Sequence, residues 1–283
     1  MLSSRNLKGR IHYAAFGTME LPWENGPDRI EQLLASRNDA SELLSFYGSL
    51  LVFQKSFFDL LEETHLVGAL AIDLPILSKY FETFLDCVAG SGSTLLRSQA
   101  QAMTRWEREK QQALLNAYWL NAEIPGGNFF PKVFLQPYAA FLVHHRTTIK
   151  DRTSATQGCP SCGAPPQLAF LQTPPSTLGG GAGSEGASRY LLCSLCFTEW
   201  QINRILCPNC GESKPDKLPY YQSEQLPLVR VEACDSCKHY LKGIDRTKDG
   251  RAVPLVDELA TPALDVWAYE NGYEKIELNL AGI

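Results

Sequence analysis

The sequence lacks an apolar run near the ~20 residues that a membrane-spanning helix needs. No apolar signal-peptide core follows the first residues, which read Met-Leu-Ser-Ser-Arg-Asn-Leu-Lys-Gly-Arg. These two absences predict a cytoplasmic protein with no membrane insertion. Thiols stay reduced in that compartment, so paired cysteines would indicate metal or redox chemistry rather than structural disulfides.

A basic excess is also missing. The 283 residues include 26 Lys and Arg against 31 Asp and Glu, which gives a net charge of -5. Proteins that bind nucleic acid usually present basic side chains that neutralise phosphates. The charge balance therefore predicts no nucleic-acid partner. A zinc ribbon that binds nucleic acid stays as an alternative, which a salt-dependent binding assay would test.

The sequence contains no Ser/His/Asp set, no phosphate-binding loop and no dinucleotide fingerprint. We therefore expect a protein that binds a partner, not an enzyme. Hydrophobic residues make up 45% and charged residues 20%, as in ordinary globular proteins. The length allows two or three domains.

The first half has the apolar spacing of helices. The clearest case is 39–64, where Asp39 is the expected N-cap. Three further helices are expected, over about 73–90, 93–121 and 131–146. Together these segments predict an all-helical N-terminal domain over residues 1–150.

The composition changes near Asp151, where cysteine, proline and glycine replace helical periodicity. A flexible Gly-rich loop is expected over 172–188. A C-terminal helix should begin at Thr261 and Pro262. Between these features the sequence predicts short strands at 168–171, 189–192, 200–205, 218–222 and 229–233.

Eight of the nine cysteines fall into Cys-x-x-Cys pairs. The four pairs are Cys159/Cys162, Cys193/Cys196, Cys207/Cys210 and Cys234/Cys237. Two intervening residues let a tight turn aim both sulfurs at one ion. Gly163 and Gly211 follow the second cysteine of their pairs and can supply the positive φ that closes such a turn. The eight cysteines are therefore the candidate metal ligands.

The spacing between the pairs predicts which of them meet. Only ten residues separate Cys196 from Cys207, enough for one connecting strand. The 30 residues after Cys162 and the 23 after Cys210 leave room for hairpins. We therefore expect an α+β protein in which the helical domain precedes two small rubredoxin-like or zinc-ribbon modules, over 151–203 and 204–283, the latter with the C-terminal helix. A crossed pairing of the turns stays open.

Each module should hold one metal ion through four thiolates, giving two ions per chain. Iron and zinc both suit four sulfurs in tetrahedral geometry. A closed zinc site would only organise the fold, whereas iron in the same site could change its oxidation state. A thioredoxin-type dithiol would occur once, in a βαβ pattern, which this sequence does not show.

Several segments together resemble the FdhE-type formate dehydrogenase accessory proteins. These segments are Cys-Pro-Ser-Cys-Gly at 159–163, Arg-Tyr-Leu-Leu-Cys-Ser-Leu-Cys at 189–196, Cys-Pro-Asn-Cys-Gly at 207–211, Glu-Ala-Cys-Asp-Ser-Cys-Lys-His-Tyr-Leu-Lys at 232–242 and the tail at 257–273. The resemblance covers most of residues 159–273 in order, while the helical half matches only in length and character.

The resemblance implies a cytoplasmic maturation factor, or chaperone, that active respiratory formate dehydrogenase requires. Such a protein would bind the catalytic subunit before export, with iron at its cysteine motifs. The alternative is an iron-dependent redox protein that donates electrons or metal to its client enzyme. Arg189, Tyr190 and Trp200 flank the cysteine turns and would form either a client-facing patch or hairpin packing. The client surface, the metal identity and the oligomeric state, a homodimer included, stay open.

Overall fold

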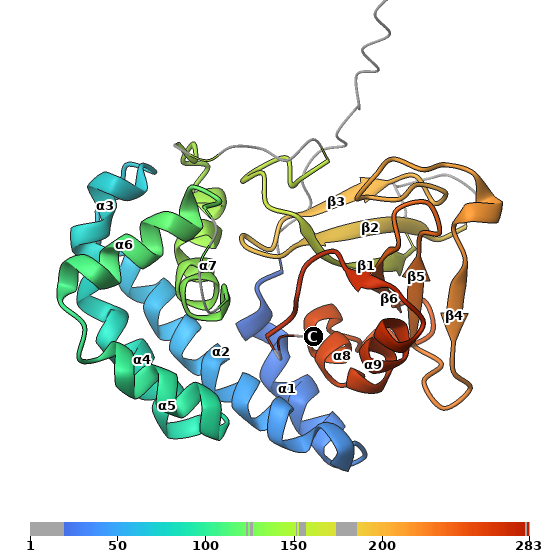
Figure 1. Ribbon diagram of the computed structural model, residues 1–283, viewed down its shortest axis with the longest axis horizontal. Coiled ribbons are helices and arrows are strands. Elements are labelled where there is room, and N and C mark those ends of the chain that lie inside the picture. Colours follow the sequence, from blue (N-terminus) through green and yellow to red (C-terminus); the bar gives the residue numbers. More distant parts are fainter. Residues whose placement is uncertain are drawn as a thin grey trace, which may run out of the picture.

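A computed structural model describes residues 20–122, 124, 127–150, 152, 157–173, 186–280 and 282. The Gly-rich loop expected over 172–188 lies largely outside these residues. Helices form one half of the molecule, and a sheet with two further helices forms the other (Figure 1). The α+β class and the order of helices, four-cysteine region and C-terminal helices are confirmed. No helix in the described part of the chain is long and apolar enough to cross a membrane.

The helical half differs from expectation mainly where helices break. It contains α1 Pro22–Leu34, α2 Ser41–Leu61, α3 Leu70–Leu77, α4 Phe81–Ser91, α5 Thr94–Met103, α6 Arg108–Trp119 and α7 Phe129–His144. A 3-10 turn at Ser78–Tyr80 separates α3 from α4, and residues 104–107 separate α5 from α6. The prediction that Asp39 caps α2 is wrong, because Asp39 lies in a preceding 3-10 turn and accepts hydrogen bonds from Arg37 (3.0 and 2.7 Å).

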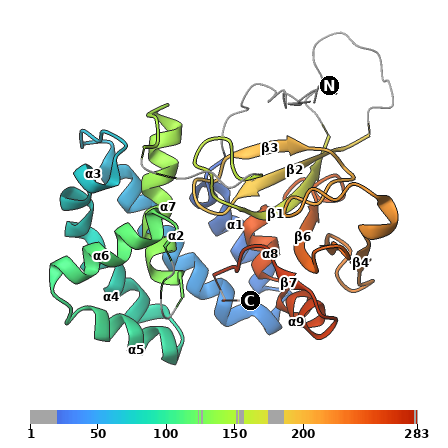
Figure 2. The same ribbon diagram turned by 45° about the horizontal axis from the view of Figure 1, so that its top comes forward.

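Helices α2 and α7 form the centre of the helical core. Phe57 of α2 stacks on Phe134 of α7 with ring centroids 5.0 Å apart, and Phe81 meets Phe134 edge-on at 5.0 Å. All three rings are buried, and each contributes about 1.5–3 kcal/mol by leaving water. Helix α7 is buried on nearly every side because it lies between the other helices and the sheet (Figure 2).

Within the described residues, seven strands form a single sheet. The strands are β1 Pro166–Gln172, β2 Ser188–Cys193, β3 Glu199–Ile202, β4 Tyr220–Gln222, β5 Val229–Ala233, β6 His239–Asp245 and β7 Glu274–Lys275. Their order is β3-β2-β1-β6-β5-β4, with β7 beside β6. Antiparallel pairs build each cysteine module, and the parallel pair β1–β6 joins the two modules. The sequence predicted β1 to β5 but missed β6 and β7.

Two helices, α8 (Pro254–Leu259) and α9 (Pro262–Glu270), cover one face of the sheet (Figure 1). Helix α9 begins at Pro262 as expected, although the Thr261 hydroxyl bonds backward to the carbonyls of Asp257 (3.1 Å) and Glu258 (3.0 Å). The unexpected helix α8 packs against β1 and β6 and also against α1. There the Arg29 guanidinium meets the Asp257 carboxylate (Nη2–Oδ1 2.6 Å), so α1 and α8 are in direct contact.

A buried ion network explains several charged residues near the end of the chain. Lys242 of β6 is fully buried and pairs with Glu258 (Nζ–Oε1 3.1 Å) and Asp265. Lys275 of β7 contacts the same two carboxylates, at 2.7 Å from Asp265 Oδ1. Burial alone would raise the pKa of Glu258, but the two ammonium groups lower it to about 2. Two cations and two anions leave this core without net charge, which limits its desolvation cost.

Candidate metal centres

The first cluster consists of Cys159, Cys162, Cys193 and Cys196. The first two lie in a turn before β1, Cys193 ends β2, and Cys196 lies in the turn that leads to β3. Their sulfurs all lie within 4.8 Å of one another. The Sγ–Sγ distance is 3.6 Å between Cys159 and Cys196 and 3.4 Å between Cys162 and Cys193. The structure thus brings the first turn to the second, as the spacing predicted.

The second cluster consists of Cys207, Cys210, Cys234 and Cys237. Its first turn lies between β3 and β4, and its second turn joins β5 to β6. The four sulfurs again lie within 4.8 Å of one another, with 3.8 Å from Cys207 to Cys237 and 3.7 Å from Cys210 to Cys234. The crossed pairing is therefore not the arrangement adopted.

All four turns share one backbone geometry. In each, the N–H of the first cysteine donates to the carbonyl five residues on: Cys159 to Ala164 at 2.8 Å, Cys193 to Thr198 at 2.9 Å, Cys207 to Glu212 at 2.8 Å and Cys234 to His239 at 2.9 Å. The residue after the second cysteine always has positive φ: Gly163 75°, Phe197 59°, Gly211 79° and Lys238 59°. The sequence indicated this conformation for the two glycines, but not for Phe197 and Lys238.

Both clusters fit a tetrahedral metal ion. Bonds of about 2.3 Å from zinc to four sulfurs would place the sulfurs about 3.8 Å apart. The four sulfur pairs given above, 3.4 to 3.8 Å apart, are close to that value. Burial raises the pKa of the Cys193 and Cys196 thiols well above their ordinary value. An ion that replaces these protons would neutralise the buried thiolates, so metal binding and folding would be coupled.

The first cluster is enclosed by both halves of the molecule. All four of its cysteines are buried, and Cys193 and Cys196 are 0% exposed. The Thr198 hydroxyl lies 3.1 Å from Cys196 Sγ and donates to Ser161 Oγ at 3.1 Å. The four sulfurs of this cluster are therefore shielded from water.

Gln136 and Arg152 hold the first cluster in place. Gln136 of α7 donates its Nε2 to the carbonyl of Ser194 at 2.9 Å. Arg152 donates Nε to the carbonyl of Cys162 at 3.0 Å and Nη1 to the carbonyl of Trp119 at 3.2 Å. Gln136 thus reaches the second turn from α7, and Arg152 links the first turn to the end of α6, so the first cluster lies at the junction of the two halves.

The second cluster lies at the surface. Cys207 and Cys234 are buried, whereas Cys210 is exposed and Cys237 is half-buried. Partial burial raises the pKa of Cys237, but hydrogen bonds from the Asn209 side chain and the His239 N–H outweigh it and lower the pKa to about 6. The two clusters therefore offer the same donor atoms in different surroundings.

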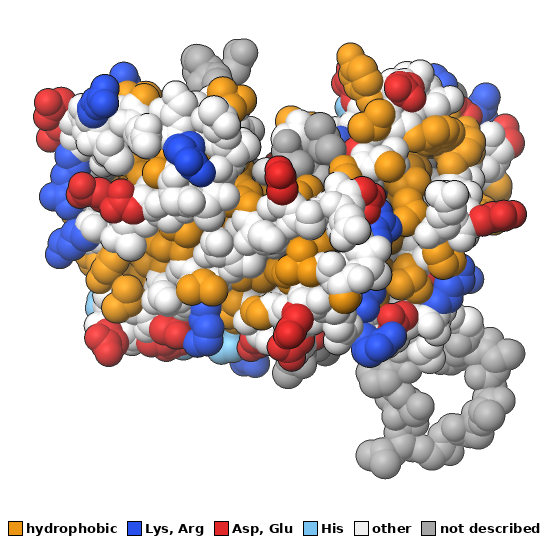
Figure 3. Space-filling model, turned by 90° about the horizontal axis from the view of Figure 1, so that it is seen from below, with side chains coloured by type: hydrophobic (Ala, Val, Ile, Leu, Met, Phe, Trp, Pro, Cys, Tyr) orange, Lys and Arg blue, Asp and Glu red, His pale blue; other side chains and the backbone are white. Residues whose placement is uncertain are grey.

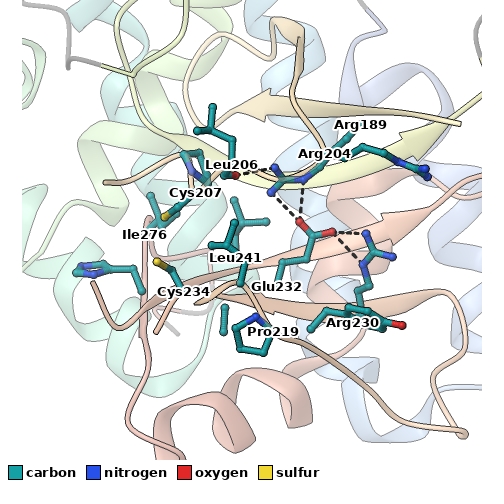
Figure 4. A pocket seen from close by; sticks show the side chains of 15 residues that line it. Arg189, Arg204, Leu206, Cys207, Pro219, Arg230, Glu232, Cys234, Leu241 and Ile276 are labelled. Atoms are coloured by element: carbon teal, nitrogen blue, oxygen red, sulfur yellow. Dashed lines mark hydrogen bonds and ion pairs between the residues drawn. The ribbon is translucent and has the colours of Figure 1, made fainter. Parts of the chain in front are cut away.

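A small cavity of about 100 Å³ adjoins the buried side of the second cluster, with Cys207 and Cys234 in its wall (Figure 4). Figure 4 shows the Glu232 carboxylate between two arginines. Arg189 approaches one carboxylate oxygen (Nη2–Oε2 2.7 Å), and Arg230 approaches the other (Nη2–Oε1 2.6 Å). The Arg189–Glu232 pair links β2 of the first module to β5 of the second.

The residues that flank the cysteine turns serve packing. Arg189 and Trp200 are buried. Tyr190 stacks on Phe170 of the neighbouring strand β1, with ring centroids 5.4 Å apart. These contacts favour the hairpin-packing interpretation over a client-facing patch.

A wide groove of about 1340 Å³ runs between the helical half and the chain after β7. Figure 3 shows a hollow between the two halves of the molecule, with hydrophobic side chains visible in it. Phe46, Leu96 and Phe129 line the helical side, and Ile276 and Leu278 line the other. Leu278 is 54% exposed, so the groove presents apolar surface to solvent.

The structure thus defines a protein of the α+β class in which a helical half is joined to two consecutive rubredoxin-like four-cysteine modules. A family model described as "FdhE, C-terminal domain" matches residues 205–281. A protein named "Protein FdhE homolog" from Aquifex aeolicus is 31% identical over 205 residues, which cover 72% of this chain and 69% of that protein. The chain belongs to the FdhE family.

Other relatives match over shorter stretches. The FdhE homologue of Haemophilus influenzae strain PittGG is 33% identical over 59% of this chain and 46% of that protein. FdhE of Escherichia coli K12 is 34% identical over 44% of this chain, so the match spans 37% of its length. The crystal structure of FdhE from Pseudomonas aeruginosa superposes with a TM-score of 0.66 over 95% of this chain and 97% of that one. At 23% identity this likeness supports the fold.

Proposed function

We propose that this protein is a cytoplasmic accessory factor for respiratory formate dehydrogenase. In this role it binds the catalytic subunit before export and acts by binding rather than by turnover of a substrate. Membership of the FdhE family supports the role, together with the two four-cysteine clusters and the helical body. The three proposed parts, 1–150, 151–203 and 204–283, are then a helical body and two metal-binding modules.

We further infer that the eight cysteines hold two metal ions per chain, iron or zinc. The observation that carries this inference is the convergence of four paired turns into two groups whose sulfurs lie within 4.8 Å. Four thiolates fill every position of a tetrahedral ion, so such a site organises the chain around it and leaves no place for a substrate.

The experiment is complementation in a host that lacks its own copy of the gene. Expression of this chain should restore formate oxidation, and the tagged chain should co-purify with the formate dehydrogenase catalytic subunit. A folded, metal-loaded chain that restores no activity and captures no catalytic subunit would refute the role. A related oxidoreductase that needs no such factor serves as the control activity.

One observation favours a second candidate, an iron-dependent redox protein that donates electrons or metal to the client. Cys210 of the second cluster is exposed, so an ion there would lie close to the surface and to a docked partner. Iron held by four thiolates gives visible charge-transfer bands that bleach reversibly on reduction. A colourless protein with two zinc ions would exclude electron donation.

A further inference from the structure

The two clusters differ far more in access than in geometry. We infer that the second cluster is an exchange site, which yields its ion to a small competing ligand and takes it up again, while the first cluster retains its ion. This inference rests on the proposal that both clusters bind metal. It gives different roles to two clusters whose Cys-x-x-Cys motifs are alike in sequence.

A competing ligand must first reach the ion or one of its sulfurs. In the first cluster every cysteine is buried, with exposed fractions from 0 to 4%. In the second cluster Cys210 is exposed and Cys237 half-buried, one from each turn, while Cys207 and Cys234 face the interior. The second site therefore has an outer pair of sulfurs that solvent can approach and an inner pair that it cannot.

Opening the first cluster would disrupt the junction of the two halves. Its turns are held by Arg152 and Gln136, and Phe197 of the second turn packs edge-on against Trp23 of α1 at 5.9 Å. Loss of such buried contacts is costly, so release of the ion would need a large part of the molecule to open.

The outer side of the second cluster is held by weaker contacts. Ser236 donates to Glu212 at 2.6 Å, and Lys238 pairs with Asp235 at 2.7 Å, all at or near the surface. Exposed pairs of this kind typically contribute about 0–1 kcal/mol. The turns that carry Cys210 and Cys237 can therefore open locally while the rest of the sheet stays folded.

The inner side of the second cluster stays fixed during such an opening. Arg189 donates Nη1 to the carbonyl of Leu206 at 2.9 Å, directly before Cys207. Its partner Glu232 lies two residues before Cys234. The buried ion pair thus holds both inner cysteines near each other, which leaves a preformed pair of ligands for an ion that returns.

The exchange is a ligand substitution without a change of oxidation state. An electron pair from a carboxylate or amine of the incoming chelator replaces each thiolate on the ion. Each released thiolate stays anionic or takes a proton from solvent. The same steps in reverse reload the site.

The test uses the full chain loaded with zinc and shown to hold two ions per chain. EDTA and N-ethylmaleimide are added together, and mass spectrometry follows zinc release and the alkylation of each cysteine. One zinc should leave at least about tenfold faster than the other, as expected if only the second site opens locally. Labelling should then appear at Cys210 and Cys237, the outer pair, before any cysteine of the first cluster. Release of both ions at one rate, or earlier labelling of the first cluster, would overturn the inference.

A variant separates metal loss from simple accessibility to the alkylating reagent. The double substitution Cys210→Ser with Cys237→Ser should hold one zinc and lack only the fast phase of release. A remaining ion that leaves at the fast rate would also overturn the inference. If the variant does not fold, the order of labelling in the natural chain decides alone. A folded chain that binds no ion before EDTA is added would refute metal binding itself.

Discussion

The guanidinium of Arg189 and the carboxylate of Glu232 form a buried ion pair between strands that are not neighbours in the sheet (Nη2–Oε2 2.7 Å). Arg189 belongs to the strand that ends in Cys193, and Glu232 to the strand that precedes Cys234. Gly243 makes this possible, because a Cβ at that position would collide with the Glu232 side chain. One ion pair thus connects the strand that leads into the first cluster with the strand that leads into the second.

Replacement of Glu232 by Gln should strongly destabilise the sheet. Burial raises the pKa of Glu232, but the charges of Arg189 and Arg230 outweigh burial and lower it, so the carboxylate is ionised in the fold. Its loss leaves Arg189 without a buried counter-charge, which should cost about 3–5 kcal/mol in a urea titration. The matched control is Asp59→Asn in the exposed Lys55–Asp59 pair, expected to cost less than about 1 kcal/mol. Equal losses in the two variants would contradict the assignment.

Glu199 should make the stability of the protein fall as the pH rises. Burial raises its pKa to about 7, against about 4.3 in the unfolded chain. The fold therefore favours the protonated form, so no penalty applies below pH ~4.3 and the full penalty applies above pH ~7. Glu199→Gln should raise the unfolding free energy by about 1–3 kcal/mol at pH 8 and have little effect at acid pH. Exposed Glu224→Gln is the control, and a pH-independent effect at Glu199 would contradict the prediction.

The residues that follow the second cysteines should respond differently to substitution. Gly211→Ala adds a Cβ at φ 79° and 2.8 Å from the Gln157 side chain, which should cost about 1–2 kcal/mol. Lys238→Gly removes a Cβ from φ 59° and loses an exposed ion pair with Asp235 and a cation–π contact with the Tyr273 ring, so it should be close to neutral, within about 1 kcal/mol. Thermal unfolding of the zinc-loaded variants measures both effects. Destabilisation by Lys238→Gly equal to that by Gly211→Ala would show that backbone conformation is not the cause.

Loss of the second cluster should disable the protein without melting its helices. The double variant Cys207→Ser and Cys210→Ser should bind one ion instead of two, disorder the cysteine turns of the last module and abolish activation of formate dehydrogenase. The far-UV circular dichroism of the helical half should persist, because its aromatic core is built from α2, α4 and α7. A variant that stays fully folded and fully active would refute the role of the metal-bound module.

The sequence predicted the cysteine pairing because chain length limits which turns can meet. It missed the break at Ser78–Tyr80 because no glycine or proline stands at the break and two polar residues, Ser78 and Lys79, are ordinary on the outer side of a continuous helix. It missed β6 because Lys242 and Gly243 stand in the middle of that strand. Lys242 is tolerated there only because carboxylates distant in sequence surround it, and no local pattern reveals such partners.

The difference between the two clusters was also invisible in the sequence. Cys159-Pro-Ser-Cys162 and Cys207-Pro-Asn-Cys210 differ by one residue inside the turn. Their burial differs because α7 and Arg152 cover the first turn pair, whereas among the described residues no helix of the N-terminal half lines the cavity beside the second. Whether a cysteine turn is exposed depends on how helices and strands distant in sequence pack against it, so the local motif does not predict it.

The contact between α1 and α8 can form only after nearly the whole chain has been made. Arg29 and Asp257 are separated by 228 positions in the chain, and β1 must likewise wait for β6 before its second edge is paired. During synthesis on the ribosome, the four cysteines of the first cluster emerge before those of the second and could already bind an ion. The edge of β1 that pairs with β6 stays open until β6 has been made, and α1 lacks its contact with α8 until α8 has been made. A nascent chain that stalls after the first module would therefore expose a β-strand edge, and this edge is where we expect newly made molecules to aggregate or to recruit chaperones.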